Sequence, residues 1–233
     1  MTSVPAASTP DPNTIGDVVR RAAEIYSSLP ALVDGDDTLS FGEMLDRVRA
    51  ASKAFIALGL EAGQTVAIWA PNSSEWVVAA LGAQNVGGVL VPVNTRFKGH
   101  EATHILDTAH VRFLVCCNGF LGIDYTSELA DVPLTHIVDV GSTRSASSRA
   151  VPISTWREFL DRGADVDDAT LVAREQAVRG EDLSDIIFTS GTTGRPKGVM
   201  SRHDQTIRVF LEWSAIAGLD SSDRYLIVNP FFH

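Results

Sequence analysis

The sequence has 233 residues, and its 29 acidic residues outnumber its 19 basic residues, so the formal net charge is −10. Hydrophobic residues at 45% and charged residues at 21% are typical of a globular protein, which excludes a disordered, collagen-like or coiled-coil chain. The acidic balance argues against binding of nucleic acid through a broad basic face. The two cysteines, Cys116 and Cys117, are adjacent and provide neither a disulfide framework nor metal-ligand spacing, which suits a reducing cytosol.

Neither a secretory signal nor a membrane span is predicted. The first twelve residues lack a cationic start and an apolar core. The longest charge-free stretch, residues 76–95, is interrupted by glycine, asparagine and proline, so it predicts a helix followed by a buried strand. We therefore expect a cytoplasmic protein without a transmembrane segment.

Apolar residues at helical spacing, opened by capping residues, predict the helices. The clearest start is at Ser40 and Glu43, which have capping-box spacing, and Gly59 ends the apolar pattern that follows. In chain order the predicted helices begin near residues 14, 40, 72 and 201, and the first and last end near residues 28 and 218.

Short apolar runs between these helices predict strands, preceded by a small hairpin at residues 33–38 around Asp34-Gly35. Strands that alternate with helices of this length imply parallel βαβ units. The predicted fold class is therefore α/β, with open, mostly parallel sheets flanked by helices on both faces. The predicted strands cover residues 65–69, 89–93, 111–116, 136–140, 185–189 and 225–228.

The predicted domain organisation has one internal boundary. Residues 141–150 are rich in serine and arginine without periodicity, which is typical of a solvated loop. The expected parts are a flexible N-terminus at residues 1–13, a first α/β subdomain at 14–140, a loop at 141–152 and the start of a second α/β subdomain at 153–233.

The segment that carries chemistry is residues 189–198, T-S-G-T-T-G-R-P-K-G, here called the signature loop. Its glycines permit positive φ and let backbone N–H groups approach a ligand. Ser190, Thr192 and Thr193 add hydroxyl donors, and Lys197 adds a mobile positive charge. These groups are the ones needed to hold a polyphosphate, where each charge-assisted hydrogen bond contributes about 1.5–3 kcal/mol. A surface linker is the simpler alternative, but a linker needs neither a preceding apolar strand nor a lysine.

The signature loop is not a Walker loop, because Arg195 and Pro196 separate Gly194 from Lys197. Its spacing resembles the phosphate-binding signature of the adenylate-forming superfamily, which includes acyl-CoA synthetases, luciferases and peptide-synthetase adenylation domains. Three further segments resemble elements of that superfamily, and the likeness runs from about residue 14 to the last residue. They are L-S-F-G-E-M at residues 39–44, N-T-R at 94–96 and N-P-F-F-H at 229–233, the last resembling an aromatic-His element near the acyl pocket.

The resemblance implies the incomplete N-terminal domain of the acyl-CoA synthetase (luciferase-like) fold. It implies ATP-dependent activation of a carboxylic acid to acyl-AMP and then to acyl-CoA, with ATP, Mg²⁺ and CoA as cofactors or substrates. Lys197 and Thr192 would have catalytic roles, Thr192 would also contact Mg²⁺, and Phe232 and His233 would form the gate of the acyl pocket. The implied phosphate-binding residues are Thr189, Ser190, Gly191, Thr192, Thr193, Gly194 and Lys197.

Family members are longer than this chain, and their adenine-binding, ribose-binding and C-terminal lysine elements have no counterpart in it. We therefore expect a truncated fragment that is inactive alone, with apolar surface exposed near Ile186 and Ile227 that favours self-association. Residues 67–72 and 223–225, together with the N-P-F-F-H segment, resemble fatty-acid–CoA ligases most, especially those that act on carboxylated steroid-ring breakdown products.

Two alternatives remain open at this stage: a short, non-catalytic nucleotide- or acyl-binding remnant, and an acid–AMP ligase that loads a carrier protein. His203 could equally be an ordinary residue at the start of a helix or a residue with a functional role. The other internal histidines are expected to lie at the surface or to be hydrogen-bonded in the core rather than to bind metal; they are His100, His104, His110 and His136.

Overall fold

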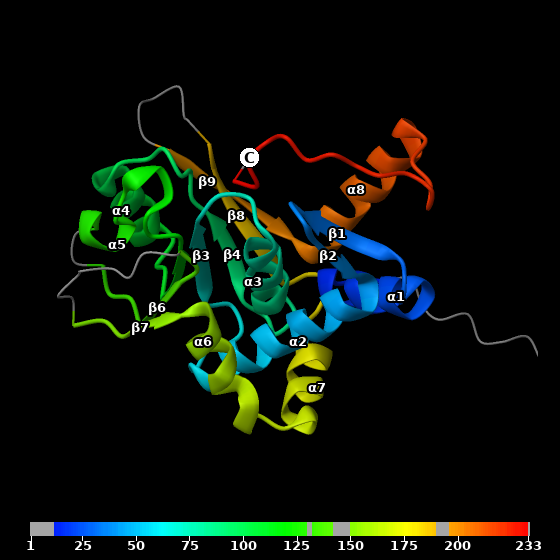
Figure 1. The fold of residues 1–233 in the computed structure, drawn as a ribbon, viewed down its shortest axis with the longest axis horizontal. Helices are drawn as coiled ribbons and strands as arrows, with labels where there is room; N and C mark the ends of the chain where they lie inside the picture. Colours follow the sequence, from blue (N-terminus) through cyan, green and yellow to red (C-terminus); the bar gives the residue numbers. More distant parts are fainter. Residues whose placement is uncertain (1–11, 130–131, 142–149, 190–195, 233) are drawn as a thin grey trace, which may run out of the picture.

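The structure, a computed structural model, describes residues 12–129, 132–141, 150–189 and 196–232. Within these residues, seven strands form one sheet with helices on both of its faces, and two more strands form a separate hairpin (Figure 1). The helices (α, or η for 3₁₀) and strands are, in chain order, α1 (Ile15–Tyr26), β1 (Pro30–Asp34), β2 (Asp37–Ser40), α2 (Phe41–Ala57), β3 (Thr65–Trp69), α3 (Ser74–Gln84), β4 (Val89–Pro92), α4 (Gly99–Thr108), β5 (Phe113–Cys116), η1 (Phe120–Gly122), α5 (Tyr125–Glu128), β6 (His136–Asp139), β7 (Ile153–Thr155), α6 (Trp156–Arg162), η2 (Gly163–Asp165), α7 (Asp168–Ala177), β8 (Leu183–Thr189), β9 (Lys197–Arg202) and α8 (His203–Ala217).

The sheet has the strand order β7-β6-β5-β3-β4-β8-β9. Its neighbouring strands run parallel except β8 and β9, which pair antiparallel. Parallel neighbours need crossover connections, and helices supply them for every pair except β6 and β7, between which the described residues contain no helix. The predicted α/β class with a mostly parallel sheet is confirmed.

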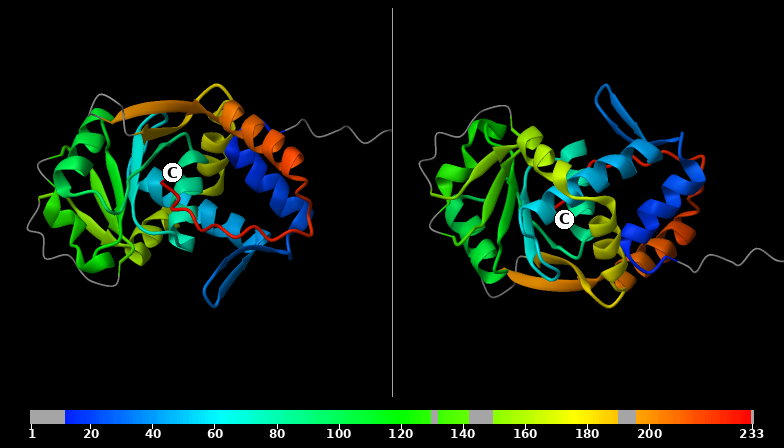
Figure 2. Two further views of the ribbon diagram at one scale, coloured as in Figure 1. Left: turned by 90° about the horizontal axis from the view of Figure 1, so that it is seen from above. Right: turned by 90° about the horizontal axis from the view of Figure 1, so that it is seen from below.

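Alternate residues of β3 point to opposite faces of the sheet, and both faces are covered. Val66 and Ile68 pack in the core beneath α2, α3, α6 and α7, whereas Ala67 and Trp69 pack beneath α4 and α5. Figure 2 shows these two groups of helices on opposite sides of the sheet. All of β3 is buried, which explains why the strand is a continuous apolar run in the sequence.

A buried polar cluster joins α1, α2 and α7 to the C-terminal end of α3. Glu175 of α7 is only 6% exposed and accepts a hydrogen bond from Asn85 Nδ2 at 2.9 Å. Arg20 of α1 donates to Asn85 Oδ1 at 2.8 Å, and Arg49 of α2 lies 3.5 Å from the second oxygen of Glu175. A buried carboxylate without partners would lower the free energy of unfolding by several kcal/mol. The partners of Glu175 must therefore stay in place, which fixes the relative positions of these helices.

Most elements predicted from the sequence are present. The capping box of α2 has both of its hydrogen bonds, from the Glu43 N–H to Ser40 Oγ at 3.2 Å and from the Ser40 N–H to Glu43 Oε2 at 2.9 Å. β1 and β2 form the predicted hairpin, with Gly35 at φ +59° in its turn. The predicted strands at residues 65–69, 89–93, 111–116, 136–140 and 185–189 correspond to β3, β4, β5, β6 and β8.

One prediction of secondary structure is wrong. Residues 225–228 form no strand, because they pair with no strand of the described chain and their side chains are 46–80% exposed. The helix predicted to begin near residue 201 is α8, which begins at His203, and residues 197–202 before it pair with β8 as β9, a strand that was not predicted.

The strands β7 and β8, which follow the predicted boundary at residues 141–152, join the same sheet as the strands before it. The division into two subdomains therefore stays a prediction. In the part of the chain that the structure describes, no helix is both long and apolar enough to cross a bilayer.

Helix α8 exposes apolar side chains on several of its sides. Val209, Phe210, Leu211 and Ile216 are 60%, 63%, 62% and 87% exposed, and three consecutive residues cannot share one face of a helix. A helix that is apolar around its circumference is normally buried. Exposed apolar surface was also predicted near Ile186 and Ile227. Ile227 is 46% exposed, whereas Ile186 is half-buried and packs against the core beneath α4 and α5.

We expect the chain to self-associate through α8 and Val209→Glu to weaken that association at least about tenfold. Burying a valine side chain contributes about 1.5 kcal/mol or more, and a carboxylate at this position opposes burial. Sedimentation velocity across a concentration series measures the effect. Val33→Glu is the matched control, because Val33 in β1 is 62% exposed and Val209 is 60% exposed. A parent chain that is monomeric at every concentration, or equal effects of both variants, would contradict the prediction.

Candidate functional site

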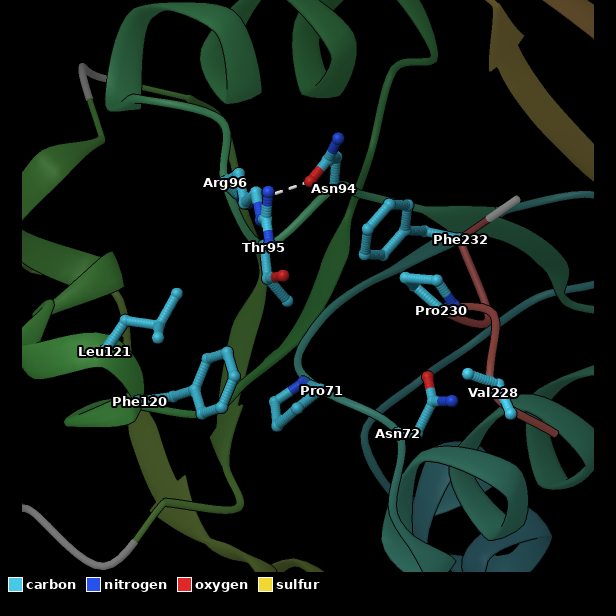
Figure 3. Close-up of a pocket in the computed structure, with 10 residues that line it drawn as sticks. All are labelled: Pro71, Asn72, Asn94, Thr95, Arg96, Phe120, Leu121, Val228, Pro230 and Phe232. Atoms are coloured by element: carbon cyan, nitrogen blue, oxygen red, sulfur yellow. Dashed lines mark hydrogen bonds between the residues drawn. The ribbon is translucent and has the colours of Figure 1, made fainter.

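A pocket of about 530 Å³ opens at the carboxyl edge of the parallel strands (Figure 3). Its walls come from the loops that follow β3, β4 and β5 and from the C-terminal segment, defined here as residues 219–232. The described residues that line it are Pro71, Asn72, Asn94, Thr95, Arg96, Phe120, Leu121, Val228, Pro230 and Phe232.

The strand order explains why a pocket forms at this point. β4 and β5 lie on opposite sides of β3, and the helices that follow β3 and β4 cover opposite faces of the sheet. The loops after these strands therefore diverge and leave a crevice, which is where ligands bind in open α/β sheets.

The two long walls of the pocket are apolar, and a cation lies at one end. Figure 3 shows Phe120 and Leu121 on one side and Pro230 and Phe232 on the other. Arg96, which follows β4, is exposed and supplies positive charge at the rim. The arrangement suits an amphipathic anion with an apolar body.

Two buried aromatic residues fix the loop that follows β4. Trp69 Nε1 donates to the backbone oxygen of Asn94 at 2.9 Å, and Tyr125 Oη donates to that of Thr95 at 3.1 Å. The rings of Trp69 and Tyr125 contact each other with centroids 4.4 Å apart. Burial raises the pKa of Tyr125 to about 12, so its hydroxyl remains a donor.

The ends of the signature loop lie at the same edge of the sheet as the pocket. β8 runs parallel to β4 and ends at Thr189, and Lys197 pairs with Thr189 at the start of β9. Both residues are exposed, so the two ends of the loop meet at a solvent-facing position. The predicted site residues Ser190, Gly191, Thr192, Thr193, Gly194 and His233 lie outside the described residues.

The sequence indicated that the glycines of the signature loop, Gly198 among them, permit positive φ, but the structure gives Gly198 another role. It is not among the described glycines with positive φ. A Cβ at this position would come within 2.8 Å of the Ile186 side chain and 3.3 Å of the Phe188 ring. The glycine is therefore needed for close packing of β9 on β8 rather than for a turn.

Phe232, predicted at the gate of the acyl pocket, lines this pocket, and its role there stays a prediction. Sequence reasoning did not predict most of the other wall residues. Asn72, Arg96 and Phe120 each follow a different strand by a few residues. The rule that ligands bind at the carboxyl ends of strands could have found them, given the strand order.

A family model described as "AMP-binding enzyme" matches residues 19–233. The chain belongs to this family.

Relatives within the AMP-binding family include two ligases named for a 7a-methyl-1,5-dioxo-octahydro-1H-inden-4-yl propanoyl group and CoA. The one from Rhodococcus jostii is 39% identical over 229 residues, which are 97% of this chain and 44% of the relative. The one from Mycobacterium tuberculosis is 44% identical over 206 residues, which are 87% of this chain and 39% of the relative. The chain thus spans less than half the length of these relatives.

Solved structures of the family have the same fold. The N-terminal domain of FACL13 from Mycobacterium tuberculosis superposes with a TM-score of 0.71 at 26% identity, over 94% of this chain and 52% of that one. The anthranilate CoA ligase AuaEII, in complex with anthranoyl-AMP, has a TM-score of 0.69 at 23% identity, over 87% of this chain and 37% of that one. At that identity the second match supports the fold alone.

His203 is a buried core residue rather than part of the pocket. It is fully buried at the start of α8, and its Nδ1 accepts a hydrogen bond from the Ile15 N–H at 3.3 Å. Within the described chain its Nε2 has no partner, and burial lowers its pKa. His136 is also buried, with Nε2 2.8 Å from Ser154 Oγ, and burial lowers its pKa from 6.5 to about 4.

We expect the free energy of unfolding to decrease as pH falls from 6.5 towards about 4, in part because of His136. The unfolded chain takes up this proton near pH 6.5, whereas the folded chain does not, so protonation favours unfolding. The full shift corresponds to about 3 kcal/mol.

Denaturant unfolding of the parent and His136→Gln at a series of pH values measures this contribution. The variant should lose part of the pH dependence, and His100→Gln, at an exposed position of α4, should retain it. Identical pH profiles for the parent and His136→Gln would exclude His136 as the source.

Proposed function

We propose that this chain provides the phosphate-binding loop and part of the acyl pocket of an enzyme that activates a carboxylic acid with ATP, giving acyl-AMP and then acyl-CoA. The observation that carries the proposal is the match of residues 19–233 to the AMP-binding family. The two described ends of the signature loop, Thr189 and Lys197, and the pocket lie at one edge of the sheet, which supports it.

The proposed chemistry solves a leaving-group problem. A carboxylate is a poor acyl donor because oxide would have to leave. Attack of a carboxylate oxygen on the α-phosphorus of ATP forms the acyl–phosphate bond and expels pyrophosphate, and a thiolate then attacks the acyl carbon and expels AMP. Such steps depend on positioning and charge stabilisation, so the chain needs no nucleophile of its own.

In this proposal Lys197 and the hydroxyls and backbone N–H groups of the signature loop hold the β- and γ-phosphates. An exposed ammonium at the end of the loop, opposite Thr189, suits a polyanion. Mg²⁺ would accompany ATP and shield its charge from the acidic protein, with Thr192 as its contact from this chain.

The proposed substrate is a ring-containing propanoic acid of the kind formed in steroid-ring breakdown, converted in the cytoplasm. The names of the Rhodococcus jostii and Mycobacterium tuberculosis relatives support this choice. The apolar walls around Phe120 and Phe232 suit a ring body, and fatty acids are the alternative acyl class.

The test is ATP–pyrophosphate exchange with a panel of acids, run on this chain and on a chimera. The chimera joins the chain to the residues that follow the matched region of the Mycobacterium tuberculosis relative. We expect exchange by the chimera with ring-containing acids, and CoA-dependent release of AMP. Nucleotide binding without exchange would favour the non-catalytic alternative, whereas exchange without use of CoA would favour loading of a carrier protein.

In the same chimera, Lys197→Ala should lower the rate of exchange about 100-fold, because loss of a charged contact to the leaving pyrophosphate costs about 3 kcal/mol. Lys98→Ala is the control, since Lys98 precedes α4 and does not line the pocket. Equal rates for the parent and Lys197→Ala would remove the assigned role, provided that the melting temperatures agree.

A further inference from the structure

The C-terminal segment forms one wall of the pocket although it has no regular secondary structure. Its residues from Leu219 to Pro230 are exposed. Asn72 and Trp76, near the start of α3, contact the end of the segment. Phe231 packs on Trp76 with ring centroids 4.8 Å apart.

Asn72 holds the segment with both ends of its side-chain amide. Its Nδ2 donates to the backbone oxygen of Asn229 at 3.0 Å, and its Oδ1 accepts from the Phe231 N–H at 2.8 Å. The two bonds engage alternate residues of the segment, much as a neighbouring strand would.

Alternate residues of the segment have different surroundings. Val228, Pro230 and Phe232 line the pocket (Figure 3), whereas Asn229 and Phe231 contact Asn72. The backbone that Asn72 holds at Asn229 and Phe231 therefore lies directly beside the residues that line the pocket.

Packing of Phe231 on Trp76 is not directional, whereas the two hydrogen bonds of Asn72 are. They hold the backbone oxygen of Asn229 and the N–H of Phe231, on either side of Pro230. They thereby constrain the backbone next to Phe232, which lines the pocket.

We propose that Asn72 is a positioning residue that anchors the C-terminal segment and thereby holds Phe232 on the wall of the pocket. Its effect on acid binding rests on the proposed function, whereas the anchoring itself does not. Asn72 acts through Phe232.

The first test is amide hydrogen exchange of Phe231 by NMR in the 233-residue chain, with Val209→Glu present in all samples to limit association. Asn72→Ala should make exchange of this amide about tenfold faster, because its acceptor is lost. Asn72→Asp keeps the acceptor and should keep most of the protection. Asn94→Ala is the matched control, since the side chain of Asn94 accepts from the Arg96 N–H, within its own loop.

The second test is binding of 1-pyrenebutyrate, a fluorescent ring acid, by the parent, Asn72→Ala, Phe232→Ala and the double variant. If Asn72 acts through Phe232, each single variant should weaken binding several-fold and the double variant should be no weaker than Phe232→Ala. A purely structural role would make the two effects multiply.

Unchanged exchange of the Phe231 amide in Asn72→Ala, or multiplicative effects on binding, would overturn the proposal. Absence of pyrenebutyrate binding in every variant would instead contradict the proposed acid pocket, and hydrogen exchange would still decide the role of Asn72. Equal melting temperatures of the variants confirm that the comparison concerns the segment and not the fold.

Discussion

The strand order around β3 is the constraint on which the site depends. β4 and β5 flank β3, and the crossover helices that follow β3 and β4 cover opposite faces of the sheet. Because β3 is buried on both faces, a shift of either neighbour would expose apolar residues and break ladder hydrogen bonds. The loops after the three strands are therefore held around one crevice. The strand pairing that stabilises the sheet thus also fixes the shape of the pocket.

Much of this sheet could be predicted from the sequence, because strands buried on both faces are continuous apolar runs. Residues 225–228 have the same character and form no strand, since composition does not reveal whether a partner strand is available. β9 shows the reverse case. Its residues 197–202 include glycine, lysine and arginine, and they become a strand because β8 offers an open edge.

The sequence predicts site residues only where they are local in the chain. The signature loop and Phe232 belong to contiguous motifs, so their residue types suggest roles, and those roles stay predictions. Pro71, Arg96 and Phe120 come together only because three separate strands end at one edge, and no spacing in the sequence specifies that order. Gly198 shows a third limit, since its contact with Ile186 depends on the pairing of β8 with β9.

In the proposed reaction, β4 separates the two reactants. The pocket lies at the end of β4 on the side of β3 and β5, and the signature loop leaves β8 on the other side. An acid in the pocket and a polyphosphate at Lys197 would therefore lie on either side of residues 94–96, and the position of this short loop would affect their separation. Because misplacement by about 1 Å can cost about 100-fold in rate, a loop of this kind must be rigid. The hydrogen bonds from Trp69 and Tyr125 to its backbone are how the core supplies that rigidity.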